Sequence, residues 1–249
     1  MRNPLRETWV AGDCTYGVGI TAASPATAQL LAHAGFDWLM LDLEHGAISP
    51  EGLHAMIAAT AGTPAAPIVR IPHPLPWLAK TALDLGAFGI VFPTVNSADD
   101  TRAAVAACRY PPVGTRQWGP FHAPARFGLS MPDYLATADI VTIVLVEHPS
   151  AIDAIEEIVA VPGVDAAVIG THDLAVALGR PGQPDHPDVA AAVARAESAI
   201  RRSPVVLGGN AFSAAQAREM VGRGYQLVAL GFDWTLLQSA ARGLLDCVR

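Results

Sequence analysis

The chain has 249 residues and a formal charge of −7, from 16 basic and 23 acidic residues. This acidic balance without a basic patch argues against a nucleic-acid partner, and no uninterrupted apolar run is long enough to span a membrane. The N-terminus lacks the apolar core of a signal peptide, and the three cysteines have no metal-type spacing, so we expect reduced thiols and a cytoplasmic protein.

Short apolar runs alternate with alanine-rich helical patterns along the whole chain. The predicted strands are residues 18–20, 38–41, 67–71, 89–92, 141–146, 166–169, 205–207 and 227–230. The predicted helices are residues 26–34, 77–85, 98–108, 152–159, 189–200, 214–221 and 234–245. Such alternation indicates a parallel sheet covered by helices. At this length we expect a single α/β domain over residues 1–249, closed as a (β/α)8 TIM barrel. An open doubly wound sheet is the alternative, but no Gly-x-Gly-x-x-Gly follows the first strand.

One long segment, residues 110–130, has no clear periodicity and is rich in proline and glycine. Loops of this length inside a compact domain usually have a function. We therefore expect the segment to cover a site or to form a subunit contact.

Ionisable residues follow several of the predicted strands, at the edge where barrel enzymes carry their chemistry. They are Asp42, Glu44 and His45 after the second strand, Arg70 after the third, Glu147 and His148 after the fifth, His172 and Asp173 after the sixth, and Asp233 after the eighth. An imidazole titrates near neutral pH, so His45 is a candidate general base. A structural histidine is the alternative.

Glu147 and Asp173 lie one strand–helix unit apart and are expected on neighbouring strands. Two carboxylates form an open oxygen-ligand site that suits Mg²⁺, Mn²⁺ or Co²⁺, and such an ion could polarise a carbonyl. The alternative is that each acid caps the helix that follows it. Spacing alone does not separate these interpretations.

Three further residues bear on the chemistry. Arg70 could stabilise an enolate or carboxylate oxygen, or could form a buried structural ion pair. Asp84 lies at the end of a predicted helix, where a carboxylate is unfavourable, which suggests a partner such as His45. Lys80 is the only lysine, and its helical surroundings argue against Schiff-base chemistry.

Several segments of the chain form a known pattern. They are Ala34-Gly35-Phe36-Asp37-Trp38, Asp42-Leu43-Glu44-His45, Ile68-Val69-Arg70, Leu83-Asp84-Leu85-Gly86-Ala87, Arg109-Tyr110-Pro111-Pro112-x-Gly114-x-Arg116, Ile169-Gly170-x-x-Asp173-Leu174, His186-Pro187 and Gly231-x-Asp233-x-Thr235-Leu236-Leu237. In these segments the chain resembles the HpcH/HpaI family of class II pyruvate aldolases, typified by 4-hydroxy-2-oxo-heptanedioate aldolase and 2-keto-3-deoxy-rhamnonate aldolase. The resemblance extends over nearly the whole chain.

The resemblance implies a barrel of the phosphoenolpyruvate/pyruvate-domain type. It implies a homo-oligomer, a hexameric trimer of dimers in which the last helix is exchanged between subunits. It also implies a divalent metal ion on Glu147 and Asp173, with His45 as base, Asp84 tuning its basicity and Arg70 stabilising the enolate. Gly170, His172, Asp173, Arg70 and Asp42 would contact the substrate, a small 2-oxo acid that is cleaved to pyruvate and an aldehyde.

The chain departs from the family pattern at three places. Leu145 replaces the usual glutamine two residues before the metal-binding glutamate. Thr171 and His172 replace a Pro-x pair before Asp173, which adds an imidazole near the expected substrate carboxylate. Gln117 and Trp118 follow Arg116 where a glycine is usual. We expect the metal chemistry to survive these changes and the substrate to differ.

Three functions are compatible with these residues. The first is metal-dependent aldol cleavage or addition of 4-hydroxy-2-oxo acids. The second is a decarboxylase or a specialised-metabolism lyase that forms the same enolate, because loss of CO₂ needs only Glu147, Asp173 and Arg70. The third is a non-catalytic oligomeric binding protein, which the presence of all the expected site residues disfavours.

Overall fold

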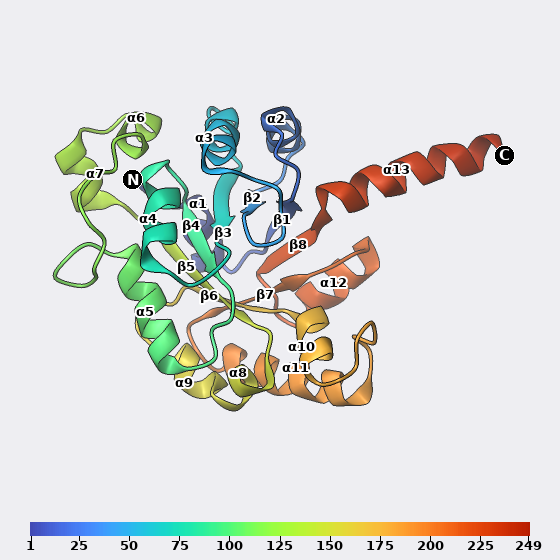
Figure 1. The fold of residues 1–249 in the computed structure, drawn as a ribbon. Coiled ribbons are helices and arrows are strands. Elements are labelled where there is room, and N and C mark those ends of the chain that lie inside the picture. The colour runs from blue at the N-terminus through green and yellow to red at the C-terminus, as the bar shows by residue number, and fades with distance from the viewer.

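The strands of the computed structural model, which describes all 249 residues, close into one parallel barrel (Figure 1). They pair in chain order, and the last strand pairs with the first. The strands are β1 (Thr15–Ile20), β2 (Trp38–Asp42), β3 (Ala66–Arg70), β4 (Gly89–Phe92), β5 (Val141–Val146), β6 (Ala166–Ile169), β7 (Val206–Asn210) and β8 (Leu227–Phe232). This confirms the (β/α)8 barrel and excludes the open doubly wound sheet.

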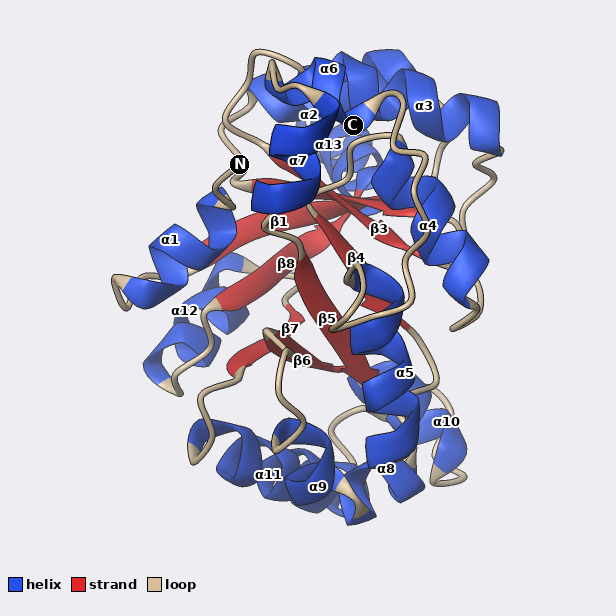
Figure 2. Ribbon diagram, turned by 90° about the vertical axis from the view of Figure 1, so that its left-hand side faces the viewer, coloured by secondary structure: helices blue, strands red, loops and turns tan.

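The chain forms thirteen helices, most of which surround the barrel on the outside (Figure 2). They are α1 (Pro4–Val10), α2 (Pro25–His33), α3 (Pro50–Ala59), α4 (Pro76–Asp84), α5 (Ala98–Cys108), α6 (Ala123–Phe127), α7 (Met131–Thr137), α8 (Pro149–Asp153), α9 (Ile155–Val159), α10 (Thr171–Ala177), α11 (Pro187–Arg201), α12 (Ala214–Gly222) and α13 (Asp233–Val248). The helix predicted over residues 152–159 is divided at Ala154 into α8 and α9. No helix of the structure is long and apolar enough to cross a membrane.

Side chains alternate between two cores along each strand, because successive residues of a strand face opposite sides. Leu39 and Leu41 of β2 belong to the outer core between strands and helices. Trp38 and Met40 belong to the inner core, which fills the barrel. The same alternation in β5 places Ile143 and Leu145 inside. Asp42, Arg70 and Glu147 each follow an inner-core residue by two positions, namely Met40, Ile68 and Leu145. The alternation therefore directs their side chains toward the mouth of the barrel.

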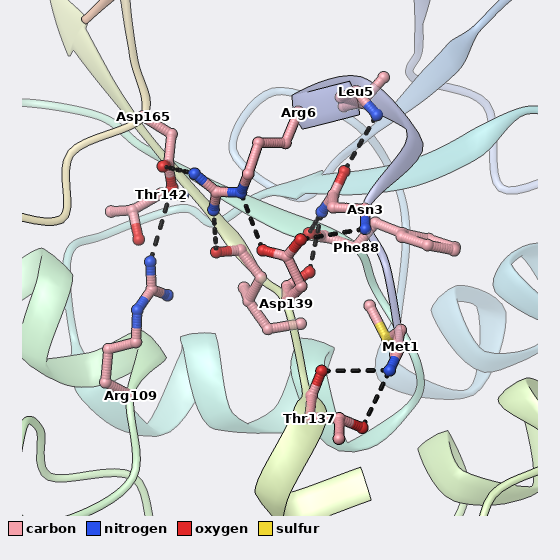
Figure 3. A network of polar contacts seen from close by, with 11 residues as sticks. Met1, Asn3, Leu5, Arg6, Phe88, Arg109, Thr137, Asp139, Thr142 and Asp165 are labelled. Atoms are coloured by element: carbon pink, nitrogen blue, oxygen red, sulfur yellow. Dashed lines mark hydrogen bonds and ion pairs between the residues drawn. The ribbon is translucent and has the colours of Figure 1, made fainter. Parts of the chain in front are cut away.

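The N-terminal segment packs against the opposite end of the barrel, where Leu5 and Trp9 join the inner core. Figure 3 shows its polar contacts. Arg6 donates a hydrogen bond to Asp139 (Nε–Oδ1 2.9 Å) and forms an ion pair with Asp165. The side chain of Asn3 donates to the carbonyls of Phe88 (2.8 Å) and Asp139 (3.0 Å). These contacts join α1 to the residues that precede β4, β5 and β6, and so fix the N-terminal ends of three strands.

The segment of residues 110–130 lies at this end of the barrel, because it leads from the end of α5 toward the start of β5. It contains α6, where Phe127 packs edge-on against Phe88 with ring centroids 5.0 Å apart. Gln117, in the middle of the segment, lines a surface cavity with Trp77 and Lys80 of α4. That the segment covers a site or forms a subunit contact, and that Gln117 and Trp118 lie near the pocket, stay predictions.

Helix α13 differs from all the others because it extends away from the barrel (Figure 1). None of its residues is buried. Its exposed apolar side chains include Leu237 (73% exposed), Leu244 (73%) and Val248 (80%). This helix leaves an apolar face without a partner in one chain.

Candidate active site

The barrel brings most of the predicted site residues to one end. Asp42 and Arg70 are the last residues of β2 and β3, and they are paired in register. Glu147 follows β5, Gly170 follows β6, and Asp173 lies in the first turn of α10. Because the strands are parallel, all of these positions lie at the carboxyl-terminal ends of the strands.

Arg70 is held between two carboxylates. Its Nε and Nη2 donate to Oδ1 and Oδ2 of Asp42 at 2.9 and 2.6 Å, and its Nη1 lies 3.2 Å from Oε2 of Glu44. Burial disfavours the charged guanidinium, but the hydrogen bonds and charge of Asp42 outweigh it and raise the pKa of Arg70 above its usual value. A guanidinium has five N–H groups, and two of them bond Asp42, so three remain, including both on Nη1 beside Glu44.

Asp42 also holds the loop that follows β2. Its Oδ1 also accepts hydrogen bonds from the backbone N–H groups of Glu44 (3.0 Å) and His45 (3.2 Å). The residue is completely buried. Contact between Asp42 and a substrate, which the family resemblance implies, is therefore not available in this structure. Asp42 fixes Arg70 and the loop that carries His45.

Glu147 has one carboxylate oxygen in use and one free. Oε1 accepts a hydrogen bond from the backbone N–H of Thr94 at 2.7 Å. Oε2 borders Gly170, where an added Cβ would lie 3.3 Å from Oε2 and 2.8 Å from Cβ of Glu147. The absence of a side chain at Gly170 therefore leaves room beside the free oxygen.

The two candidate metal ligands repel each other. The pKa of Glu147 is raised above its usual value, chiefly by burial; the N–H of Thr94 opposes the rise and the charge of Asp173 adds to it. A divalent cation between the two carboxylates would remove this repulsion. No group of three or more His, Cys, Asp or Glu side chains with metal-binding geometry occurs, so such a cation would keep positions open for other ligands.

Neither carboxylate acts as a helix cap. The N-cap of α8 is His148, whose Nδ1 accepts from the backbone N–H of Ser150, and the N-cap of α10 is Gly170, which makes no side-chain cap hydrogen bond. The capping alternative for Glu147 and Asp173 therefore finds no support. The donor set fits a hard, oxygen-preferring divalent ion.

His45 stands at the open side of the site. Its side chain is 66% exposed, and its Nε2 lies 3.8 Å from Oε2 of Glu44. The pKa of Glu44 is raised, first by burial; the charge of Arg70 lowers it and that of Glu147 raises it. An exposed imidazole beside the carboxylates can exchange protons with both substrate and water.

Asp84 lies elsewhere in the same chain. It is the last residue of α4, and helices of a barrel end at the face opposite the strand ends. Its Oδ1 pairs with Nη2 of the buried Arg116 at 2.8 Å. Within this chain the partner of Asp84 is thus Arg116 and not His45, and the tuning of His45 by Asp84 stays a prediction. Lys80 also lies on α4, away from the strand ends.

Two residues near the site, Thr94 and Phe212, were not identified from the sequence. The structure also locates Leu145, one of the departures from the family pattern. Thr94 binds Glu147 through its backbone, which no side-chain pattern can signal. Phe212, which is 49% exposed, packs edge-on against His172 with ring centroids 5.5 Å apart. Leu145 lines an apolar cavity of about 40 Å³ beneath Arg70.

Known proteins share this chain's sequence and fold. The model of the HpcH/HpaI aldolase/citrate lyase family matches residues 16–240. A hydroxypyruvate/pyruvate aldolase of Paraburkholderia phytofirmans is 36% identical over 99% of this chain and 98% of its own length. A 4-hydroxy-2-oxo-heptane-1,7-dioate aldolase of Salmonella dublin is 37% identical over 98% of this chain and 94% of its own length. The crystal structure of a family protein from Burkholderia cenocepacia J2315 has a TM-score of 0.94 and 36% identity, with complete coverage of both chains. The chain belongs to the HpcH/HpaI aldolase/citrate lyase family.

Proposed function

We propose that this protein is a class II aldolase that cleaves 4-hydroxy-2-oxo acids to pyruvate, or a related 2-oxo acid, and an aldehyde, and that also catalyses the reverse addition. Relatives named as a hydroxypyruvate/pyruvate aldolase and a 4-hydroxy-2-oxo-heptane-1,7-dioate aldolase match almost the whole chain. Dependence on a divalent metal ion is typical of the family. The single observation that carries the proposal is the meeting of Glu147, Asp173 and Arg70 at one mouth of the barrel.

Glu147 and Asp173 would hold the cation, with Mg²⁺, Mn²⁺ and Co²⁺ as candidates. When bound, the ion would act as a Lewis acid toward the ketone and carboxylate oxygens of a 2-oxo acid. Gly170 leaves room beside the free Oε2 of Glu147. The N–H groups of Arg70 that do not bond Asp42 would donate to the ketone oxygen as negative charge develops there.

Proton transfer falls to His45. In the cleavage direction it would take the proton of the C4 hydroxyl through a water molecule. The C3–C4 bond then breaks, the aldehyde leaves, and the electron pair forms the enolate of pyruvate, which is protonated at C3. His172, which packs against Phe212, directly precedes Asp173, where its imidazole would lie near the substrate carboxylate.

The assay that tests this function measures pyruvate released from 4-hydroxy-2-oxo acids in the presence of Mg²⁺, by coupling to lactate dehydrogenase. We expect release that EDTA abolishes and that Asp173→Ala lacks while keeping its circular dichroism spectrum. Full activity in Asp173→Ala would refute the metal assignment. CO₂ release from oxaloacetate well above aldol cleavage would favour the decarboxylase instead.

We further propose that the chain forms a homo-oligomer, a trimer of dimers, through exchange of α13. The unburied apolar face of this helix supports the proposal. Any influence of Asp84 on His45 would then have to act between subunits, because within one chain Asp84 pairs with Arg116. The absence of disulfides is compatible with the expected cytoplasmic location.

A further inference from the structure

Thr94 has an unusual backbone conformation. It is the only residue other than glycine with a positive φ, at 54°. A β-branched residue is strongly disfavoured in this left-handed region and stays there only when its surroundings hold it. Its side chain is exposed and makes no hydrogen bond that would explain the conformation.

The surroundings of Thr94 hold its backbone from both sides. Pro93 and Val95, its two neighbours, are buried and anchor the chain. The side-chain Nδ2 of Asn96 donates to the carbonyl of Thr94 at 3.1 Å. The backbone N–H of Asn96 in turn donates to Oδ2 of Asp100 at 3.0 Å, in the first turn of α5. The left-handed turn is thus tied to the start of a helix.

The consequence of this conformation is the direction of one N–H group. The backbone N–H of Thr94 donates to Oε1 of Glu147 at 2.7 Å. With Oε1 occupied, the carboxylate can rotate little, and Oε2 is presented on the side where Gly170 leaves space. Groups that orient metal ligands in this way typically contribute 10–100-fold to metal affinity.

We propose that Thr94 and Asn96 are positioning residues that aim the carboxylate of Glu147 at the cation, a role that rests on the proposed function. In this role, the strained turn after β4 supplies the backbone N–H of Thr94 to Oε1 of Glu147. If the turn served only to lead the chain from β4 into α5, the hydrogen bond to Glu147 would have no effect on metal binding.

Calorimetric titration of the full-length, metal-free protein with Mn²⁺ tests this role. Thr94→Pro removes the donor and forces φ to a negative value. We expect Mn²⁺ affinity to fall at least tenfold. Thr94→Gly keeps the N–H and accepts the positive φ without strain. We expect it to bind Mn²⁺ within about threefold of the wild type, which makes it the matched control.

Asn96→Ala provides the second variant, in case Thr94→Pro does not fold. It leaves the backbone of Thr94 intact but removes the hydrogen bond to its carbonyl. We expect weaker Mn²⁺ binding together with a native circular dichroism spectrum. Kinetics with saturating Mn²⁺ should restore most of kcat in Asn96→Ala, which a general loss of structure would not allow.

The outcomes separate this role from the function on which it rests. A wild-type protein that binds no Mn²⁺ would overturn both. A wild-type protein that binds Mn²⁺, with Thr94→Pro or Asn96→Ala folded and binding as tightly, would overturn the positioning role alone. Equal losses in Thr94→Pro and Thr94→Gly would also overturn it, because the effect would then not follow the N–H group.

Discussion

Arg70 and Asp42 form a bidentate pair at the carboxyl ends of neighbouring strands, with Nε–Oδ1 and Nη2–Oδ2 distances of 2.9 and 2.6 Å. The Asp42 side chain has no solvent exposure, and that of Arg70 is 11% exposed. The pair fixes the one guanidinium of the site and, through Asp42, the loop of His45. Loss of this pair should therefore lower the free energy of unfolding and also disturb the site.

Asp42→Ala should destabilise the fold by about 3–5 kcal/mol, because it leaves a buried cation without its main partner. Unfolding in urea, followed by circular dichroism, measures this change. The control is Asp153→Ala, which breaks the exposed pair of Asp153 with Arg195 (Nη1–Oδ1 2.8 Å). That loss should be about 0–1 kcal/mol. Similar losses in the two variants would show that the Arg70–Asp42 pair is not the anchor described here.

Gly170→Ala should weaken Mn²⁺ binding by at least about tenfold without unfolding the protein. The added Cβ would lie 2.8 Å from Cβ of Glu147, so the ligand must shift. Calorimetric titration with Mn²⁺ gives the affinity. Gly222→Ala, on α12 with no atom within 4 Å of the added Cβ, should leave it unchanged. Unaltered affinity in Gly170→Ala would place the cation away from Oε2 of Glu147.

Stabilisation by metal should depend on pH through Glu147. Its pKa is raised in the folded state, mainly by burial, with a further contribution from Asp173. Without a cation this carboxylate destabilises the fold at neutral pH, and the penalty disappears as pH falls through the raised pKa. A cation binds only the deprotonated form. The increase in Tm with Mn²⁺ should therefore be full at neutral pH and shrink at mildly acidic pH, still above the ordinary pKa of a glutamate.

Differential scanning fluorimetry with and without Mn²⁺, across this pH range, provides the measurement. The control is Glu147→Gln, which should lose the Mn²⁺ effect and, without metal at neutral pH, be at least as stable as the wild type. An Mn²⁺ effect of constant size from neutral to mildly acidic pH, or one retained in Glu147→Gln, would contradict this account of the site.

Helix α13 should carry the subunit contact. Leu237→Glu combined with Leu244→Glu places two charges on its exposed apolar face, and a buried interface would not tolerate them. Light scattering coupled to size exclusion should then show a smaller particle than the wild type. Leu30→Glu changes an equally exposed leucine on α2 (73% exposed) and should leave the mass unchanged. A wild-type monomer would contradict the proposed oligomer.

The strands could be predicted because each is an apolar run with clear ends. The bounds of β4, β5 and β6 agree with the sequence prediction residue for residue. The sequence prediction lacked the helices α1, α3, α6, α7 and α10. Three of these begin with a capping residue followed by a proline within two positions: Asn3 before α1, Ser49 before α3 and Ser130 before α7. That signal would have located them.

The site was predictable where chemistry depends on side chains and on strand order. Asp42, Arg70 and Glu147 meet because parallel strands end at one edge. The partner of Asp84 could not be predicted, since Arg116 is 32 residues away and reaches it only through helix packing. Nor does any local pattern mark Thr94 as left-handed, because the cause is its packed neighbours and Asn96. Such contacts arise from tertiary structure alone.

Exchange of the methyl protons of pyruvate in D₂O, followed by proton NMR with Mg²⁺, tests the central claim most directly. Enolisation at the Glu147–Asp173–Arg70 mouth requires no aldehyde, so the result does not depend on knowing the acceptor. We predict loss of the methyl signal with the wild-type protein, abolished by EDTA and by Asp173→Ala. Absence of exchange with Mg²⁺, Mn²⁺ and Co²⁺ alike would contradict the assignment of this protein as a metal-dependent pyruvate aldolase.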